Sequence, residues 1–196
     1  MNDVQITVAV KENLGVLAKY DNEIIYGFIG ECKRLSGAVD AVKITYSSLL
    51  YQEIKEGYHL VTGELRKTVS GLYIYATHIE KLDAEPEQYV NEVNLKGTLY
   101  TAPKSHNLSK SGTQIADFKL KVMRNSVKFD VLPCIVWKKQ AIASLGYNVG
   151  DTISLRGRVQ SKTRLSSSVL IEVSCNYISK VGDEDEAVIQ DSSVRG

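Results

Sequence analysis

Basic side chains alternate with apolar ones in the second half of the chain. Along residues 93–100, 116–122 and 152–160, apolar residues occupy every second position, so a β-strand would turn the intervening residues, Gln160 among them, to its opposite face. The cations on that outer face are predicted to be Lys96, Lys119, Lys121, Arg156 and Arg158. Rows of lysine and arginine neutralise successive phosphates, so the chemistry indicated is non-covalent binding of a polyanion.

Flat side chains accompany these cations. Tyr100 falls on the outward side of its run, and Trp137, the single tryptophan, ends the run 128–137. Residues 131–137 of that run are apolar on both faces, which is typical of a strand buried on both sides or of an exposed platform on which bases stack. Cations that follow a backbone and rings that stack on bases together bind single-stranded nucleic acid. On the sequence alone, Trp137 is either a core residue or a stacking residue.

Two polar, basic segments border the alternating runs. Residues 103–114 join the first two runs of the second half, and residues 161–168 join the last two. Residues 103–114 contain serine, glycine and asparagine, and residues 161–168 are rich in serine. Together the two segments contribute the candidate phosphate contacts Lys104, Lys110, Lys162 and Arg164. We expect these segments to form a basic rim around the cationic face.

Catalysis has no support in the sequence. Nucleophile elbows, phosphate loops, HExxH and dinucleotide-binding fingerprints are all missing. His59, His78 and His106 are isolated from one another, and the three cysteines are too far apart for a disulfide framework or a metal knuckle. We therefore expect a protein that is not an enzyme and has no cofactor and no metal site.

Charge divides the chain into contrasting parts. Residues 1–90 have a net charge of −4, residues 91–182 a net charge of +9, and residues 183–196 a net charge of −4. A basic segment within a near-neutral protein is typical of a module that binds a polyanion such as nucleic acid. No run of 18 apolar residues and no secretory signal is visible, so we expect a cytoplasmic, nucleoid-associated protein without a membrane partner.

The predicted elements repeat at an offset of about 90 residues. Each half reads as three strands, a short helix (47–57 and 138–150) and two more strands. Glycines also recur in the fourth strand of each half, in GYHLVTGEL (57–65) and GDTISLRGRV (150–159). The predicted fold class is all-β, with two tandem OB-folds, each a five-stranded Greek-key barrel with a helix between its third and fourth strands. The alternative is one sandwich of ten similar strands.

The predicted domains are a first OB-fold (1–90), a second OB-fold (91–181) and an acidic tail (182–196), with a polar linker at 83–92. Because the first OB-fold is acidic, we expect it to form an assembly or partner interface rather than to bind DNA. Its tyrosines are candidates for that interface: Tyr26, Tyr46, Tyr73 and Tyr75.

Four segments of the second half resemble the single-stranded-DNA-binding proteins of bacteria and phages. They are NEVNLKGTLY (91–100), IADFKLKV (115–122), FDVLPCIVWKKQA (129–141) and VGDTISLRGRVQSKT (149–163). The resemblance implies an OB-fold, non-catalytic binding of single-stranded DNA, an assembly of four barrels and a base-stacking role for Trp137. The family often ends in an acidic tail with an apolar tip, whereas this chain has the acids but ends in SSVRG.

Two functions follow as hypotheses. The first is sequence-tolerant binding and protection of single-stranded DNA during replication, recombination or repair. The expected assembly is a homodimer that presents four OB-folds, and its possible partners are replication or repair proteins. The second is a replisome or primosome adaptor whose barrels mainly bind protein partners and bind single-stranded DNA or RNA weakly. RNA is a further ligand of the same face, because stacking and phosphate contact tolerate either sugar.

Overall fold

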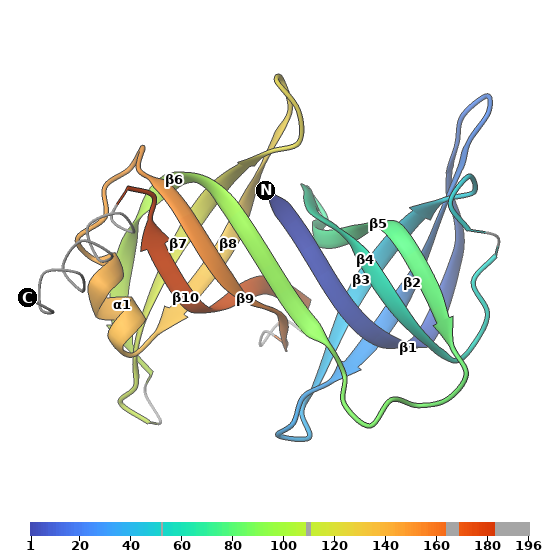
Figure 1. The fold of residues 1–196 in the computed structure, drawn as a ribbon, viewed down its shortest axis with the longest axis horizontal. Helices are drawn as coiled ribbons and strands as arrows, with labels where there is room; N and C mark the ends of the chain where they lie inside the picture. The colour runs from blue at the N-terminus through green and yellow to red at the C-terminus, as the bar shows by residue number, and fades with distance from the viewer. Residues whose placement is uncertain (52, 109–110, 164–168, 183–196) are drawn as a thin grey trace, which may run out of the picture. The chain divides into compact units, whose positions relative to one another are not determined.

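The computed structural model describes residues 1–51, 53–108, 111–163 and 169–182, which form ten β-strands and one short helix (Figure 1). The strands of the first half are β1 (Asn2–Lys19), β2 (Ile24–Lys33), β3 (Val39–Ser47), β4 (Tyr58–Thr68) and β5 (Gly71–Leu82). The elements of the second half are β6 (Asn91–Asn107), β7 (Gln114–Met123), β8 (Phe129–Trp137), α1 (Lys139–Ser144), β9 (Thr152–Thr163) and β10 (Val169–Lys180).

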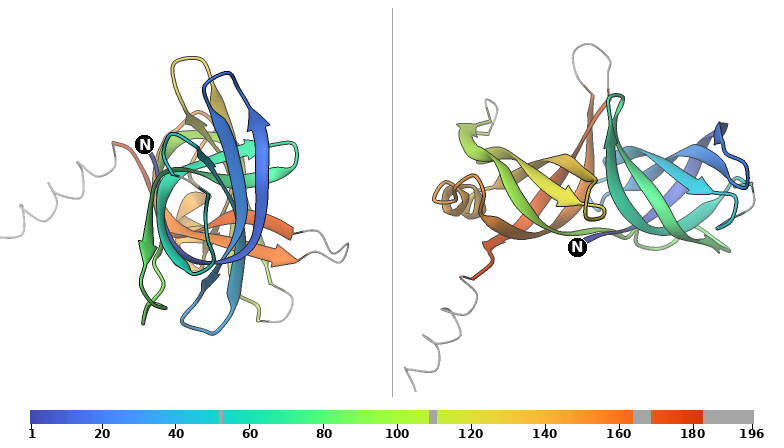
Figure 2. Two further views of the ribbon diagram at one scale, coloured as in Figure 1. Left: turned by 90° about the vertical axis from the view of Figure 1, so that its right-hand side faces the viewer. Right: turned by 90° about the horizontal axis from the view of Figure 1, so that it is seen from above.

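Strand pairing builds the same closed barrel twice. In the N-terminal barrel the order is β2-β3-β5-β4-β1, and β1 also pairs with β2 to close the ring. In the C-terminal barrel the order is β6-β7-β8-β10-β9, closed by β6 and β9. Seen end-on, β1–β5 curve around a closed interior (Figure 2). This topology confirms two tandem OB-folds, and the single sandwich is wrong.

The alternation of apolar residues places the core as predicted. Val4, Ile6 and Val8 of β1 are at most 1% exposed, and Val93, Leu95 and Leu99 of β6 are buried to the same degree. Phe28 in β2 and Phe118 in β7 lie 90 positions apart and fill equivalent sites in the two cores. β-Branched and aromatic residues at a period of two therefore specify both barrels.

An arginine–aspartate pair closes the same hairpin in each barrel. Between β2 and β3, the Arg34 Nε donates to Asp40 Oδ2 at 2.6 Å, and a second guanidinium nitrogen bonds to Oδ1. Between β7 and β8, Arg124 and Asp130 make the same two-pronged contact at the same spacing along the chain. Both carboxylates are buried, so the pairing offsets the cost of removing each charge from water.

The repeated glycine of the fourth strand has a steric cause. A Cβ atom at Gly63 would lie 2.2 Å from the carbonyl oxygen of Tyr75, and one at Gly157 would lie 2.3 Å from that of Ser174. In both barrels, only glycine lets the fourth strand approach the fifth this closely.

One of the two predicted helices forms. Helix α1 packs against β7 and β8 and buries Ala141 and Ser144. The helix predicted at 47–57 is wrong: the described residues there form a turn followed by irregular chain. The Ser47 hydroxyl accepts a bond from the Leu49 N–H at 3.1 Å, and the Tyr46 hydroxyl accepts one from the Ile54 N–H at 2.9 Å. These side-chain bonds to the backbone compete with a helical turn.

The chain divides into two compact units that do not follow the barrel boundary. Of the described residues, the N-terminal unit contains those between 2 and 93 and also 158–163 and 169–173, from the outer part of the β9–β10 hairpin. The C-terminal unit contains Met1, the described residues between 94 and 157, and residues 174–182. The connection after β5 belongs to the N-terminal unit, where Glu85 accepts hydrogen bonds from the hydroxyls of Tyr58 (2.9 Å) and Tyr89 (3.1 Å).

A buried histidine makes the stability of the N-terminal barrel sensitive to acid. His59 on β4 is fully buried, with its ring against Tyr51, and burial lowers its pKa below the ordinary value of 6.5. Below that pH the unfolded chain binds a proton that the folded chain resists, so the free energy of unfolding falls as the pH drops. We expect His59→Leu to flatten the decline in unfolding free energy between about pH 7 and about pH 5, measured by denaturant titration. His78→Leu, at an exposed position, is the control, and an unchanged slope in the His59 variant would contradict the assignment.

Candidate nucleic-acid interface

The outer face of β6, β7 and β8 brings cations and apolar side chains together. Lys119 pairs across β7 and β8 with Pro133, and Lys121 pairs with Val131. On the other side, Thr98 and Thr101 of β6 pair with Lys121 and Lys119. The alternate residues of β7, such as Phe118, point into the core, as predicted. In an OB-fold, the face of the second and third strands is where oligonucleotides bind.

Trp137 lies at the end of this face. Its ring is half-buried, and its Nε1–H donates to the Ser174 hydroxyl on β10 at 3.0 Å. Across the strand pair it faces Ile115, which is 2% exposed. The tryptophan is therefore anchored at its polar edge without being enclosed by the core. An anchored ring loses little freedom when a base stacks on it.

Strand β6 contributes three further candidates, and all are exposed. They are Lys96, Tyr100 and Lys104. Tyr100 sits at an irregularity in the β6–β7 pairing, between Leu99 and Thr101, and is 51% exposed. Lys104 lies opposite Asp117, which is 3.5 Å from a ring nitrogen of His106. The basic rim is therefore partly balanced by an acid at this end of the face.

The cations of β9 have different surroundings. Arg156 is exposed, with its guanidinium 4.9 Å from the centre of the Tyr177 ring. Arg158 points elsewhere, because its Nη1 lies 3.3 Å from an oxygen of Asp40. Lys162 forms an ion pair with the buried Glu172. Two of these three predicted phosphate contacts are thus engaged by acids of the protein itself.

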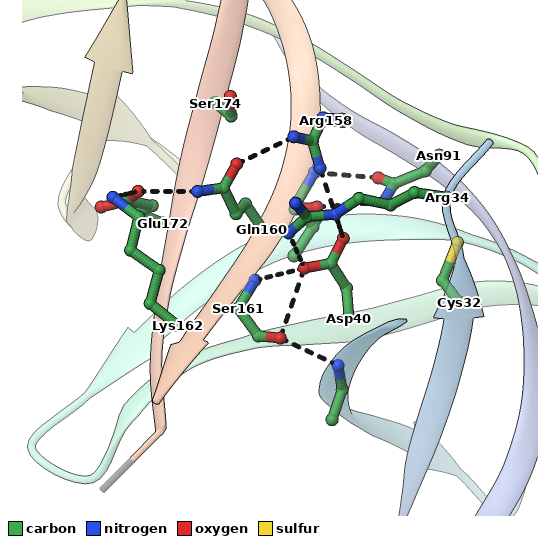
Figure 3. Close-up of polar contacts among 12 residues, drawn as sticks. Cys32, Arg34, Asp40, Asn91, Arg158, Gln160, Ser161, Lys162, Glu172 and Ser174 are labelled. Carbon is green, nitrogen blue, oxygen red and sulfur yellow. Dashed lines mark hydrogen bonds and ion pairs between the residues drawn. The ribbon is translucent and has the colours of Figure 1, made fainter. Parts of the chain in front are cut away.

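Asp40 is the centre of this polar cluster (Figure 3). Its carboxylate is fully buried and accepts bonds from Arg34, from Arg158 and from the Ser161 N–H at 2.7 Å. Asn91 extends the cluster, because its side chain exchanges two hydrogen bonds with the backbone of Val159 (2.8 and 3.0 Å).

Gln160 lies on the side of β9 that the alternation predicted, together with Arg158, but it is buried there instead of exposed. The residue is 5% exposed, and its side chain bonds to Arg158 and to Glu172. The reason is the place of residues 158–173, which pack within the N-terminal unit instead of continuing an open strand face.

The equivalent face of the N-terminal barrel has different residues where the C-terminal barrel has the lysine and the tryptophan of its outer face. Ninety positions before Lys121 stands Glu31, which forms an ion pair with Lys11. Ninety positions before Trp137 stands Ser47, which is 6% exposed. Lys33 forms an ion pair with Glu85. The contrast in charge seen in the sequence is therefore also a contrast between equivalent surfaces.

Two tyrosines expected at an interface of the N-terminal barrel are already covered. Tyr46 is fully buried and stacks with Tyr26 at 5.5 Å between ring centres. The ring of Tyr75 is covered by the Arg66 guanidinium at 3.7 Å. Tyr46 is thus a core residue, and its prediction as an interface residue is wrong.

The candidate cations Lys110 and Arg164 lie outside the described residues, as do the tail acids from Asp183 onward. Within the described ranges, no three His, Cys, Asp or Glu side chains are grouped to hold a metal ion, and no helix is long and apolar enough to cross a membrane.

The thiol of Cys32 on β2 is buried close to the carboxylate of Asp40. Burial first, and the negative charge of Asp40 second, raise the pKa of Cys32 to about 11, so this thiol is protonated at neutral pH.

Solved structures share this architecture. The wild-type single-stranded DNA binding protein from Thermus aquaticus is similar over 92% of this chain and 92% of its own, with a TM-score of 0.73 and 16% identity. A deletion mutant of the same Thermus protein aligns over 92% and 94%, with a TM-score of 0.72 and 15% identity. The N-terminal domain of PriB from Thermoanaerobacter tencongensis covers 46% of this chain, with 26% identity and a TM-score of 0.40, too low to bear on the fold. No family model and no curated protein matches the sequence. The chain therefore has the tandem OB-fold of the Thermus protein.

Arg156 and Arg158 on β9 are expected to differ in how much they contribute to the stability of the fold. We expect Arg158→Glu to lower the free energy of unfolding by about 1–3 kcal/mol, because it places a carboxylate against the buried Asp40. Arg156→Glu should change it by no more than about 0.5 kcal/mol, as is usual for an exposed position. Urea denaturation of the full chain measures both. Equal stability of the two variants would mean that the Asp40 cluster does not hold Arg158.

Proposed function

We propose that the chain binds single-stranded DNA without sequence preference, on the outer face of β6–β8 together with Arg156. The observation that carries this proposal is the cross-strand pairing of Lys119 and Lys121 with Pro133 and Val131, on the strand that ends in Trp137. Phosphates would meet the lysines, and bases would lie on the apolar surface and the indole. The biological role would be protection of DNA strands exposed in replication, recombination or repair.

Electrostatics favours the C-terminal barrel as the binding barrel. Residues 91–182 have a net charge of +9, against −4 for residues 1–90. Among the described residues, Lys119 and Arg156 make no ion pair with an acid, whereas Lys11 and Lys33 of the N-terminal barrel both do. Counterion release needs cations that are not already neutralised, so the C-terminal face would gain more from a phosphate chain.

The Thermus protein of the same fold is named for binding single-stranded DNA, which agrees with this proposal. From the resemblance of the second half to single-stranded-DNA-binding proteins, we also propose a homodimer, in which two chains contribute four OB-folds. The N-terminal barrel would then serve assembly or protein partners, which include replication and repair proteins. An adaptor that binds mainly proteins is the alternative outcome of the experiments below.

The first experiment uses the single tryptophan as a reporter. Adding poly-dT should quench the fluorescence of Trp137, because a stacked base lies against the ring. Trp137→Ala should weaken binding by about 1–3 kcal/mol, the usual contribution of one stacked base. The variant's thermal melting serves as the control for folding. Unchanged fluorescence and an unchanged dissociation constant would place the DNA elsewhere, and no binding by the wild type would favour the adaptor.

The second experiment assigns the binding face by charge. Lys119→Gln should reduce the slope of log affinity against log salt by about 0.7, the value for one phosphate contact on a single strand. Lys43→Gln is the matched control. Lys43 lies on β3 of the N-terminal barrel, ninety positions before Pro133 of β8, and Pro133 is the cross-strand partner of Lys119. Affinity for poly-dT at several salt concentrations measures both. A loss in the Lys43 variant alone would assign DNA to the N-terminal barrel.

A further inference from the structure

Phe129 is an exposed aromatic residue at the start of β8. The chain has three phenylalanines; Phe28 and Phe118 are at most 3% exposed, whereas Phe129 is 46% exposed. Its ring has a cation beside it, because the Lys121 Nζ lies 4.3 Å from the ring centre. A single exposed apolar side chain is ordinary. An exposed aromatic ring with a lysine beside it is different, because surfaces that bind single strands combine rings for stacking with cations for the phosphates.

Phe129 and Trp137 mark the two ends of one strand face. Both have the same parity on β8, and their partners on β7 run from Met123 to Ile115. Between them, Val131 and Pro133 are partly exposed, whereas Ile135 is fully buried. At about 3.3 Å per residue the two rings are roughly 26 Å apart along the strand. The two lysines of β7 lie opposite the interval between them. A nucleic-acid strand that follows β8 would therefore meet a ring, then cations, then a second ring.

The N-terminal barrel shows that the barrel fold does not require this ring. Val39 holds the same place, because it pairs with Lys33 beside the Arg34–Asp40 contact, as Phe129 pairs with Met123 beside Arg124–Asp130. Val39 is also 46% exposed, so the site is equally open in both barrels. The cation is replaced as well, since Glu31 stands where the C-terminal barrel has Lys121. At these two equivalent positions, the C-terminal barrel therefore has a ring beside a cation, and the N-terminal barrel has neither.

We propose that Phe129 is a second base-stacking residue, at the opposite end of β8 from Trp137, and that Lys121 contacts the phosphate of the base stacked there. This inference rests on the proposed function and adds to it the path of the strand, which runs along β8 from one ring to the other. Trp137 alone then holds a short oligonucleotide, and both rings engage only a longer one.

The test compares oligo-dT of increasing length on the full-length protein. Phe129→Leu keeps an apolar side chain but removes the ring face, and Phe129→Tyr keeps the ring. We expect the leucine variant to bind long oligomers roughly 5- to 100-fold more weakly, as for the loss of one stacked base, and the tyrosine variant to bind them as the wild type does. The shortest oligomers that still quench Trp137 should bind all three proteins equally.

Val39→Leu, at the equivalent position of the other barrel, should leave binding of every length unchanged. Thermal melting shows that each variant is folded, which is expected because Phe129 is half exposed. If the leucine variant binds long oligomers like the wild type while Trp137 is still quenched, Phe129 is not a DNA contact and the proposed function stands. If the wild type neither binds nor is quenched, the proposed function itself fails. Equal weakening by leucine and tyrosine would show a packing role instead of stacking.

Discussion

The buried carboxylate of Asp40 constrains more of this molecule than any other single group among the described residues. A charge with no solvent exposure must be paired, and Asp40 accepts bonds from Arg34, Arg158 and Ser161. Through Arg34 it closes the β2–β3 hairpin. Through the other two it holds the outer part of the β9–β10 hairpin within the N-terminal unit. Strand β9 therefore begins in one compact unit and ends in the other, and its cations have different surroundings on either side of Gly157.

The two barrels keep one framework and differ on the surface. The paired arginine and aspartate, the buried phenylalanine and the glycine of the fourth strand recur in both barrels, where they join a hairpin, fill the core and let the fourth strand approach the fifth. The outer-face positions differ between the two barrels. There Glu31 corresponds to Lys121, Ser47 to Trp137 and Val39 to Phe129. A fold does not by itself imply a binding function, and here the two copies of one fold differ in the groups a ligand would touch.

Local patterns in the sequence predicted most of the fold. A period of two identified the buried faces of β1, β6 and β7, and the recurring glycines aligned the two halves before their steric cause was visible. The helix at 47–57 failed because its apolar spacing fitted a helix, whereas bonds made by the Ser47 and Tyr46 side chains set a different backbone. Such bonds leave no periodic signal.

The surroundings of Arg158 and Gln160 have a long-range cause. Arg158 and Gln160 alternate correctly along β9, yet Arg158 is held by Asp40, 118 positions earlier in the chain. Alternation predicts which face a residue occupies but not what covers that face. Arginine and aspartate six positions apart do occur in both halves, at 34 and 40 and again at 124 and 130, and this repeated spacing was the available sign of a paired acid. It would have indicated the hairpin contact, though not the recruitment of Arg158.

The chemistry of the outer face also bears on selectivity. Reading a base requires donors and acceptors set in fixed pairs against its edge, as arginine or asparagine provides. The central positions of the β7–β8 face are instead lysines, valine and proline, with aromatic rings at the two ends of β8. Lysine meets the phosphate, which every nucleotide has, and a ring meets the flat surface that every base has. The one threonine hydroxyl with a described bond there, that of Thr101, already accepts the Lys119 N–H at 2.9 Å. On the proposed function, a face composed in this way would bind a strand according to its length and charge and would not read its sequence.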